Sequence, residues 1–372
     1  MKKVFVSSVN ALSVLGFSPQ ETDKSLVRNV SGIKLHEKPE ISPLPFYAAT
    51  INAEKLQAAF KEYANPGAYS KLEQMLITSA KLAEKDTSIP FSSADTIFIL
   101  STTKGNIDQL AARKGIKLAE LASVVAQFFK NKNTPIVISN ACISGVAALL
   151  VGKRLIVSGK YKNAVVLGGD IVSAFTLSGF QSFKALSPGP CKPFDEKREG
   201  LSLGEGAATL VLSEKESGVV VAGGGVSNDA NHISGPSRTG DGLFKAVSVA
   251  IRDAKINKES IGYVSAHGTA TLYNDEMECK ALNQAGLSNV PLNSLKGFVG
   301  HTLGAAGLME SVMGIYAMEK SRIYPSCGYE KSGVSLPLNV IKESLYGSFD
   351  CFLKTASGFG GCNAALIFQK NG

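Results

Sequence analysis

The apolar positions of this chain follow two different periods. Short apolar runs have the length and residue types of buried strands, and they lie at 4–8, 96–100, 135–139, 164–167, 208–212 and 219–222. Apolar residues recur at helical spacing over 69–85, 118–129 and 242–254. Residues 142–158 are apolar nearly all round, which predicts a helix buried on every side. Alternating strands and helices predict an α/β fold with helices packed on sheets.

The second half of the chain has the same alternation of predicted strands and helices as the first. We expect strands at 263–265, 351–355 and 364–369, and helices at 276–284 and 304–320. No repeat is legible as residue identity, so any duplication is structural. We place the division between two halves at 1–217 and 218–372. The runs 208–212 and 219–222 are expected to be adjacent strands joined by a turn.

The N-terminus has two lysines followed by apolar residues, which is also a feature of signal peptides. However, the first residues alternate like a strand, and Ser7, Ser8 and Asn10 interrupt the apolar run. We therefore expect a first β-strand here and a cytosolic protein. Ser18 and Glu21 predict a capping box at the start of a helix. No window has the roughly 18 uninterrupted apolar residues of a membrane span.

Composition narrows the choice of partners. The chain of 372 residues is 44% hydrophobic and carries a net charge of +8. The charge indicates either a solvated basic surface or an acidic partner. No dense basic run with interleaved aromatic residues is present, so we expect no nucleic acid. The six cysteines include no CxxC pair, so we expect no metal site and reduced thiols.

Cys142 is the first candidate for chemistry. A strand is predicted to end at Ser139 and a helix to begin at Cys142, which places the thiol at a helix N-terminus. The unpaired N–H groups and the helix dipole favour a thiolate there. The alternative from this local pattern alone is a buried structural cysteine.

Two of the four histidines lie in glycine-rich loops. His267 follows a short apolar strand, and His301 precedes a helix rich in glycine and alanine. A third glycine-rich loop, 358–363, lies between two apolar strands and exposes backbone N–H groups. Each feature alone also fits an ordinary structural loop. Together, one thiol and two imidazoles form a coherent set for thioester chemistry.

The order of these motifs resembles the elongating β-ketoacyl-acyl carrier protein synthases, of the ketosynthase I/II type, in the thiolase superfamily. The matching segments are ACISG at 141–145, PFD at 193–195 with Arg198 and GEGA at 204–207, HGTAT at 267–271 with Asp275 and Glu278, Lys296 with GHTLGAAG at 300–307, and GFGGCN at 358–363. The resemblance covers nearly the whole chain. It implies a thiolase-like fold in which two similar α/β halves form α-β-α-β-α layers.

The resemblance also implies a decarboxylative Claisen condensation in fatty-acid, polyketide or polyene biosynthesis. Cys142 is expected to be acylated by a thioester carried on phosphopantetheine. His267 and His301 are then expected to stabilise the enolate formed from a malonyl-carrier. No further cofactor and no metal are implied.

Supporting roles are implied for the remaining motif residues. Lys296 is expected to pair with Glu278, with Asp275 nearby, and to hold the His301 loop. Thr269 and Thr271 are expected to bind the pantetheine arm. The backbone N–H groups of Cys142 and Phe359 are expected to form an oxyanion hole, with Phe359 as a gate. Gly360 belongs to the same substrate-binding loop.

The family's carrier protein is acidic, which gives the charge of +8 a candidate cause. We expect a homodimer, with a heterodimer containing a second ketosynthase-like subunit as the alternative. The chain departs from the family pattern at Leu272, at Cys362 and over 7–10, and is shorter than typical elongating synthases. These departures leave the acyl substrate open.

Two rival functions remain from the sequence. A thiolase acting on coenzyme A esters would use Cys362 as a base, but the His267 loop has the pattern of the decarboxylating enzymes. A non-condensing partner subunit, like the chain-length factors, usually lacks the nucleophile. Cys142, His267, His301 and Lys296 are all present, which favours activity.

Overall fold

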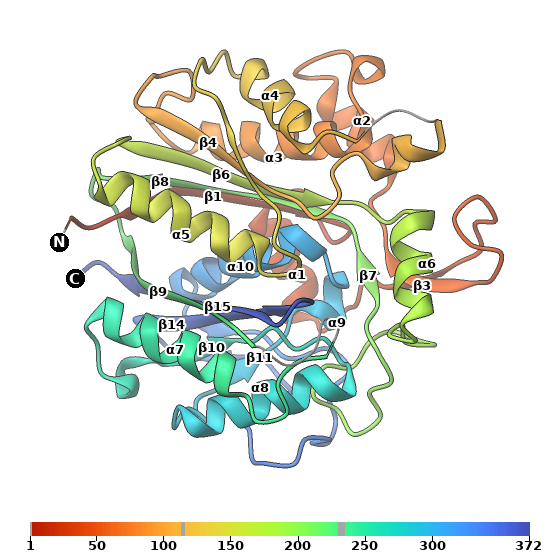
Figure 1. Ribbon diagram of the computed structural model, residues 1–372, viewed down its shortest axis with the longest axis vertical. Helices are drawn as coiled ribbons and strands as arrows, with labels where there is room; N and C mark the ends of the chain where they lie inside the picture. The colour runs from red at the N-terminus through yellow and green to blue at the C-terminus, as the bar shows by residue number, and fades with distance from the viewer. Residues whose placement is uncertain (1, 113–115, 230–234) are drawn as a thin grey trace.

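The computed structural model describes residues 2–112, 116–229 and 235–372, which form five layers (Figure 1). Among these residues, one continuous sheet has the strand order β11-β10-β14-β15-β9-β1-β8-β6-β4-β5. It consists of two halves that meet where β1 and β9 pair at Phe5 and Val220. In Figure 1 the two halves lie one above the other, with α5 and α10 between them.

The two halves of the sheet have the same pairing pattern. In each, two antiparallel pairings are followed by two parallel ones. The first half contains β1 (Phe5–Ser13), β8 (Gly206–Ser213), β6 (Asn163–Asp170), β4 (Thr96–Ser101) and β5 (Ile136–Ile138). The second contains β9 (Val219–Asn228), β15 (Cys362–Lys370), β14 (Cys351–Gly358), β10 (Tyr263–Ser265) and β11 (Leu292–Asn293). The thiolase-like architecture expected from the motifs is therefore present.

Helices cover both outer faces and fill the middle layer. The outer face of the first half carries α2 (Ala53–Phe60), α3 (Lys71–Lys85) and α4 (Leu118–Phe128). The outer face of the second carries α7 (Asp241–Ala254) and α8 (Leu272–Gln284). Between the halves lie α5 (Ser144–Val157) and α10 (Ala306–Glu319). Residues 306–318 of α10 are all buried, as the all-round apolar pattern of a central helix requires.

Shorter elements complete the fold. They include α1 (Pro19–Val27), α6 (Ala174–Ser182), α9 (Lys296–Val299), a small sheet of β2 (Lys34–His36), β3 (Phe46–Ala49) and β7 (Leu203–Gly204), and the pair β12 (Arg322–Ile323) and β13 (Leu345–Tyr346). The link between the halves runs from Ser213 to Val219, and the expected division after residue 217 falls within it. No helix in the described part of the chain is long and apolar enough to cross a membrane.

Three expectations about local structure need correction. The runs 208–212 and 219–222 are strands but not neighbours, because β1 lies between β8 and β9 and pairs along its length with β8. The central helix begins at Ser144, not at Cys142, since Ala141 has a φ of 43° and turns the chain first. Ser18 does cap α1, but the Glu21 carboxylate accepts the N–H of Phe17 in place of that of Ser18.

Glycines allow α5 and α10 to approach each other closely. A Cβ on Gly145 would lie 2.8 Å from the backbone nitrogen of Leu308. A Cβ on Gly307 would lie 2.7 Å from Cγ2 of Val146 and 3.0 Å from its backbone nitrogen. Both contacts are shorter than ordinary van der Waals separations, so the middle layer has no room for a methyl group at these crossings.

We predict that Gly307→Ala destabilises the protein by about 1–3 kcal/mol, because the added methyl overpacks the crossing. Gly179→Ala is the control, since a Cβ at this position of α6 would have nothing within 4 Å. That variant should be neutral or more stable by up to about 1 kcal/mol, as expected for glycine to alanine in a helix. Urea unfolding of both variants tests this. Equal stabilities of the two variants would contradict the close packing.

Candidate active site

Cys142 lies in the turn between β5 and α5, at the floor of a cavity of about 340 Å³. The turn is fixed by Ser144, whose hydroxyl donates to the carbonyl of Ala141 and accepts the N–H of Asn140. Cys142 as a whole residue is 9% exposed. The sequence placed Cys142 correctly between strand and helix, although it lies two residues before the helix begins.

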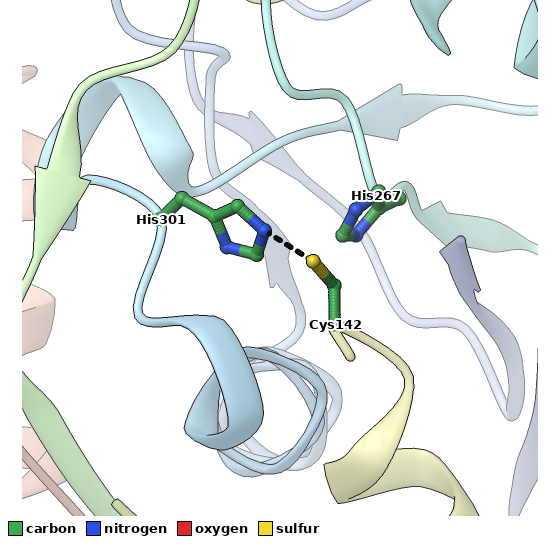
Figure 2. Close-up of side chains that lie close together, drawn as sticks. All are labelled: Cys142, His267 and His301. Atoms are coloured by element: carbon green, nitrogen blue, oxygen red, sulfur yellow. Dashed lines mark hydrogen bonds between the residues drawn. The ribbon is translucent and has the colours of Figure 1, made fainter. Parts of the chain in front are cut away.

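His301 faces the thiol directly (Figure 2). Its Nε2 atom lies 3.0 Å from Sγ of Cys142. Its Nδ1 atom accepts the backbone N–H of Leu303 at 3.3 Å, so the proton of the neutral imidazole belongs on Nε2. Gly300 precedes the histidine with a φ of 66°, and a Cβ there would lie 2.4 Å from the carbonyl oxygen of Leu203. Glycine is therefore needed to bring His301 to the thiol.

His267 lies on the other side of Cys142 and comes from the end of β10 (Figure 2). Its ring is nearly perpendicular to that of His301, with centroids 5.2 Å apart. One ligand-type atom from each of Cys142, His267 and His301 falls within 4.8 Å of the others. The structure thus brings together the three residues that the sequence singled out from two halves of the chain.

Lys296 contacts His267 and not Glu278. Its Nζ atom lies 3.2 Å from Nδ1 of His267 and donates to the same residue's carbonyl oxygen. Its carboxylate partner is Glu310, at 2.6 Å. The expected pair with Glu278 is wrong, because both oxygens of that carboxylate are already used on the backbone of the His267 loop. Lys296 therefore orients His267, and its donation to Nδ1 places the ring proton on Nε2.

Two buried carboxylates hold the His267 loop. Glu278 accepts the N–H groups of His267 and Gly268, each at 2.8 Å. Asp275 accepts the N–H groups of Thr269 at 2.9 Å and of Phe194 at 2.7 Å. The PFD segment is thereby tied to the histidine loop, which gives that segment a structural role. Neither carboxylate reaches the cavity.

The remaining substrate-binding candidates line the cavity with one exception. Thr269 and Thr271 both line it, and their hydroxyl oxygens lie 2.9 Å apart. Phe359 lines it from the turn between β14 and β15, with its ring stacked on that of Phe180. Gly360 does not line it, and its carbonyl accepts the side chain of Asn228.

Gly358 explains why the last motif begins with glycine. A Cβ at this position would lie 3.0 Å from the backbone nitrogen of Cys142 and 3.1 Å from Sγ of Cys362. The β14–β15 turn therefore lies directly against the backbone amide of Cys142. The oxyanion hole expected from Cys142 and Phe359 remains a prediction.

Two buried residues of the site were missed from the sequence. Glu310 pairs with Lys296, and Lys354 of β14 pairs with the second oxygen of Glu310 at 2.6 Å. A signal was available for both. Lys354 is the single charged residue in the segment CFLKTASG, and Glu310 stands alone in an apolar stretch of its helix. A charge in an otherwise apolar element needs a buried partner.

Burial sets the protonation states of the three reactive groups. It raises the pKa of the Cys142 thiol to about 12, although the charges of Lys296 and Lys104 act in the opposite direction. It also lowers the pKa of His267 and of His301 well below 6.5, and Lys296 adds to both shifts. The thiol is therefore protonated and the imidazoles are neutral at pH 7. Removal of Cys142 from solvent outweighs the helix end that was expected to favour a thiolate.

The donor set does not suit a metal ion. Although the sulfur and the imidazole nitrogens are close enough to surround one, both Nε2 atoms carry protons, because Leu303 and Lys296 donate to the two Nδ1 atoms. A metal ligand needs a free lone pair on the nitrogen that faces the ion. The arrangement is instead two N–H donors aimed at the space around a thiol.

Comparison with known proteins agrees with this geometry. The family models for the N-terminal and C-terminal domains of β-ketoacyl synthases match residues 1–218 and 219–330. The chain belongs to the β-ketoacyl synthase family. It is an acyltransferase of the 3-oxoacyl-[acyl-carrier-protein] synthase class, which condenses an acyl thioester with a malonyl thioester as carbon dioxide is lost.

Individual relatives come from both fatty-acid and polyketide enzymes. A putative mitochondrial 3-oxoacyl-[acyl-carrier-protein] synthase of Schizosaccharomyces pombe is 27% identical, over 100% of this chain and 99% of that protein. The 3-oxoacyl-[acyl-carrier-protein] synthase 2 of Vibrio cholerae is 35% identical over 63% of this chain and 62% of its own. One chain of a solved complex, the ketosynthase ApeO with its chain length factor ApeC from Xenorhabdus doucetiae, is 25% identical, with a TM-score of 0.88 over 100% of this chain and 98% of the matched chain.

The histidines predict a pH dependence of stability. Because their pKa values are depressed in the folded protein, the unfolded chain takes up protons below pH 6.5 that the folded chain does not. Stability should therefore fall as the pH falls from 7 to 5. In His301→Gln this fall should be smaller by up to about 2 kcal/mol, since an ordinary histidine takes up its proton over this range.

Urea unfolding of wild type and His301→Gln at pH 7, 6 and 5 checks this expectation. Asp275 acts in the opposite sense, because burial raises its pKa to about 6, but it is present in both proteins. The difference between the two proteins therefore isolates the histidine. Identical pH slopes would contradict a neutral, buried His301.

Proposed function

We propose that this chain is the condensing subunit of a carrier-protein-dependent β-ketoacyl synthase, with Cys142 as nucleophile and His267 and His301 as hydrogen-bond donors. The observation that carries the proposal is the placement of both imidazoles around one buried thiol, within 4.8 Å of each other. Both Nε2–H groups are directed by donors on their Nδ1 atoms. Such donors stabilise negative charge on oxygen without a metal ion.

The first step transfers the acyl group to Cys142. Its sulfur attacks the thioester carbonyl, a new C–S bond forms, and the bond to the pantetheine sulfur breaks. The thiol proton leaves Cys142 and ends on the departing pantetheine sulfur. Because burial raises the pKa of Cys142 to about 12, proton loss accompanies the attack and does not precede it.

The second step uses the two imidazoles. A malonyl thioester enters, its carboxylate leaves as carbon dioxide, and the freed electron pair forms an enolate. The Nε2–H groups of His267 and His301 hydrogen-bond the enolate oxygen. The enolate carbon then attacks the acyl-Cys142 carbonyl, the C–C bond forms, the C–S bond breaks, and the released thiolate takes a proton from solvent. Neutral imidazoles suit this role, since each has one proton to donate.

The carrier is proposed to be an acyl carrier protein whose phosphopantetheine arm enters the cavity. Thr269 and Thr271 offer hydroxyl groups along its wall, and Phe359 lies at its edge, 39% exposed. A solved structure in the same fold class is described as a type II polyketide acyl-carrier protein in complex with its ketosynthase. The net charge of +8 suits an acidic carrier. No other cofactor is proposed.

The thiolase alternative would require Cys362 as a base at the reacting carbon. Its thiol is not among the groups that line the cavity and instead contacts the carbonyl of Phe359 at 3.3 Å. Burial raises its pKa to about 11. These observations favour the condensing reaction.

The second candidate function is that of a non-condensing partner subunit. Two solved structures of similar fold are ketosynthases together with a chain length factor, which supports a heterodimer as well as the homodimer expected from the sequence. Size-exclusion chromatography with light scattering should give a dimer of this chain, or a one-to-one complex once a second ketosynthase-like subunit is added. A chain that stays monomeric in both experiments contradicts the dimer.

We predict that wild type gains one acyl mass when incubated with an acyl-carrier thioester, and that Cys142→Ala gains none. Cys362→Thr is the matched control, because it removes the neighbouring thiol and should be acylated like wild type. Intact-protein mass spectrometry measures all three. If folded wild type is not acylated but binds a homologous synthase, the partner-subunit function replaces the condensing one.

A further inference from the structure

Lys354 is a second buried lysine beside the catalytic histidine. It lies in β14, its side chain is fully buried, and its Nζ atom has three close oxygen neighbours. These are the carbonyl oxygens of Ser265 at 2.9 Å and Ala266 at 3.0 Å, and Oε2 of Glu310 at 2.6 Å. Burial lowers the pKa of Lys354, and the charge of the adjacent Glu310 carboxylate acts in the opposite direction, in favour of the ammonium form.

Lys296 contacts the next residue of the same segment and the same carboxylate. It reaches the carbonyl oxygen and Nδ1 of His267 and binds Oε1 of Glu310 at 2.6 Å. The two lysines therefore bind the three consecutive carbonyls of residues 265–267 and share one carboxylate. Glu310 has two oxygens, and each lysine occupies one of them.

We propose that Lys354 is a positioning residue for His267. By occupying Oε2 of Glu310 and fixing the carbonyls of Ser265 and Ala266, it keeps Lys296 on Nδ1 of His267 and so keeps the Nε2–H aimed at the substrate. The proposal rests on the proposed condensing function. Without Lys354, both oxygens of Glu310 are available to Lys296. The carboxylate then competes more strongly with the His267 imidazole for the ammonium group of Lys296.

The balance of buried charge supports this role. Lys296 and Lys354 offset Glu310 and Glu278, all four of which are buried. Removal of Lys354 leaves one ammonium facing two carboxylates, next to the place where the enolate oxygen becomes negative. An uncompensated buried carboxylate is costly, and its negative charge opposes the developing one.

The effect should be specific to one half of the reaction. His301 is oriented by other groups, since Nδ1 accepts the N–H of Leu303, and the next amide, of Gly304, binds Asp170 at 2.7 Å. Its contact with Cys142 does not involve β10 or β14. Acylation of Cys142 should therefore persist when Lys354 is changed, whereas decarboxylation, which needs His267, should not.

The test compares Lys354→Met with Lys153→Met. Lys153 is a matched control because it is also buried and binds one strand carbonyl, of Ala222 at 2.9 Å, and one carboxylate, of Asp253 at 2.7 Å. It lies on α5 and contributes nothing to the cavity lining. Two rates are measured for each protein: acylation by intact mass in a single turnover, and release of carbon dioxide from malonyl-carrier by the pre-acylated enzyme.

We expect Lys354→Met to acylate within about threefold of wild type and to release carbon dioxide about 10²-fold more slowly, the size of losing one aimed donor. Lys153→Met should change neither rate by more than about threefold. An equal fall of both rates in Lys354→Met, or no fall in either, overturns the proposal. If the wild-type protein itself is not acylated, the proposed condensing function is wrong.

A second variant covers the case in which Lys354→Met does not fold. Lys354→Gln keeps an amide that donates to the strand carbonyls but removes the charge. If the charge and the contact to Glu310 matter as proposed, this variant also loses carbon dioxide release and keeps acylation. If Lys354→Gln keeps both rates, the lysine has only a structural role and the proposal fails.

Discussion

The site depends on one shared layer of helices. α5 and α10 lie side by side between the two halves of the sheet, and glycines let their backbones come into contact. Cys142 stands two residues before α5, and His301 stands before the turn that leads into α10. The two halves have the same strand order, so Cys142 and His301 occupy equivalent places in them. The distance from sulfur to imidazole is thus set by how closely two buried helices pack.

Fixed hydrogen positions follow from the groups around the histidines. Neither imidazole is free to choose its tautomer, because a backbone N–H and an ammonium group donate to the two Nδ1 atoms. Burial keeps both rings neutral, and the same burial keeps the thiol protonated. The site therefore holds no preformed thiolate, and its catalytic strength lies in donors that are already aimed when substrate arrives.

Much of this was predictable from residue patterns. The strand and helix periods identified most elements, and Cys142, His267 and His301 were found because a thiol and two histidines stood in turns beside glycine. The failures have a common cause, which is that contacts between distant segments leave no local signal. β1 inserts between β8 and β9 although the sequence places those two next to each other, and Lys296 pairs with Glu310 because Glu278 is fully used by backbone N–H groups.

The lone charges of Glu310 and Lys354 were the missed clue. Each interrupts an apolar element, and that is a warning that a partner lies elsewhere in the chain. The partner itself could not be deduced, since two lysines and three carboxylates, Asp275, Glu278 and Glu310, allow several pairings. Helix starts were also missed by two residues at α5, where the backbone of Ala141 turns before the helix begins.

The middle layer also makes each half depend on the other to bury its apolar surface. α10 belongs to the second half but packs on β1 and β8 of the first as well as on β14, while α5 packs on β4 and β6 and also reaches β15 of the second. The inner face of each half of the sheet is therefore shielded from solvent partly by a helix from the other half. A fragment ending in the link at 214–218 would leave these apolar inner faces exposed, so we expect the two halves to fold as a single unit despite their matching topology.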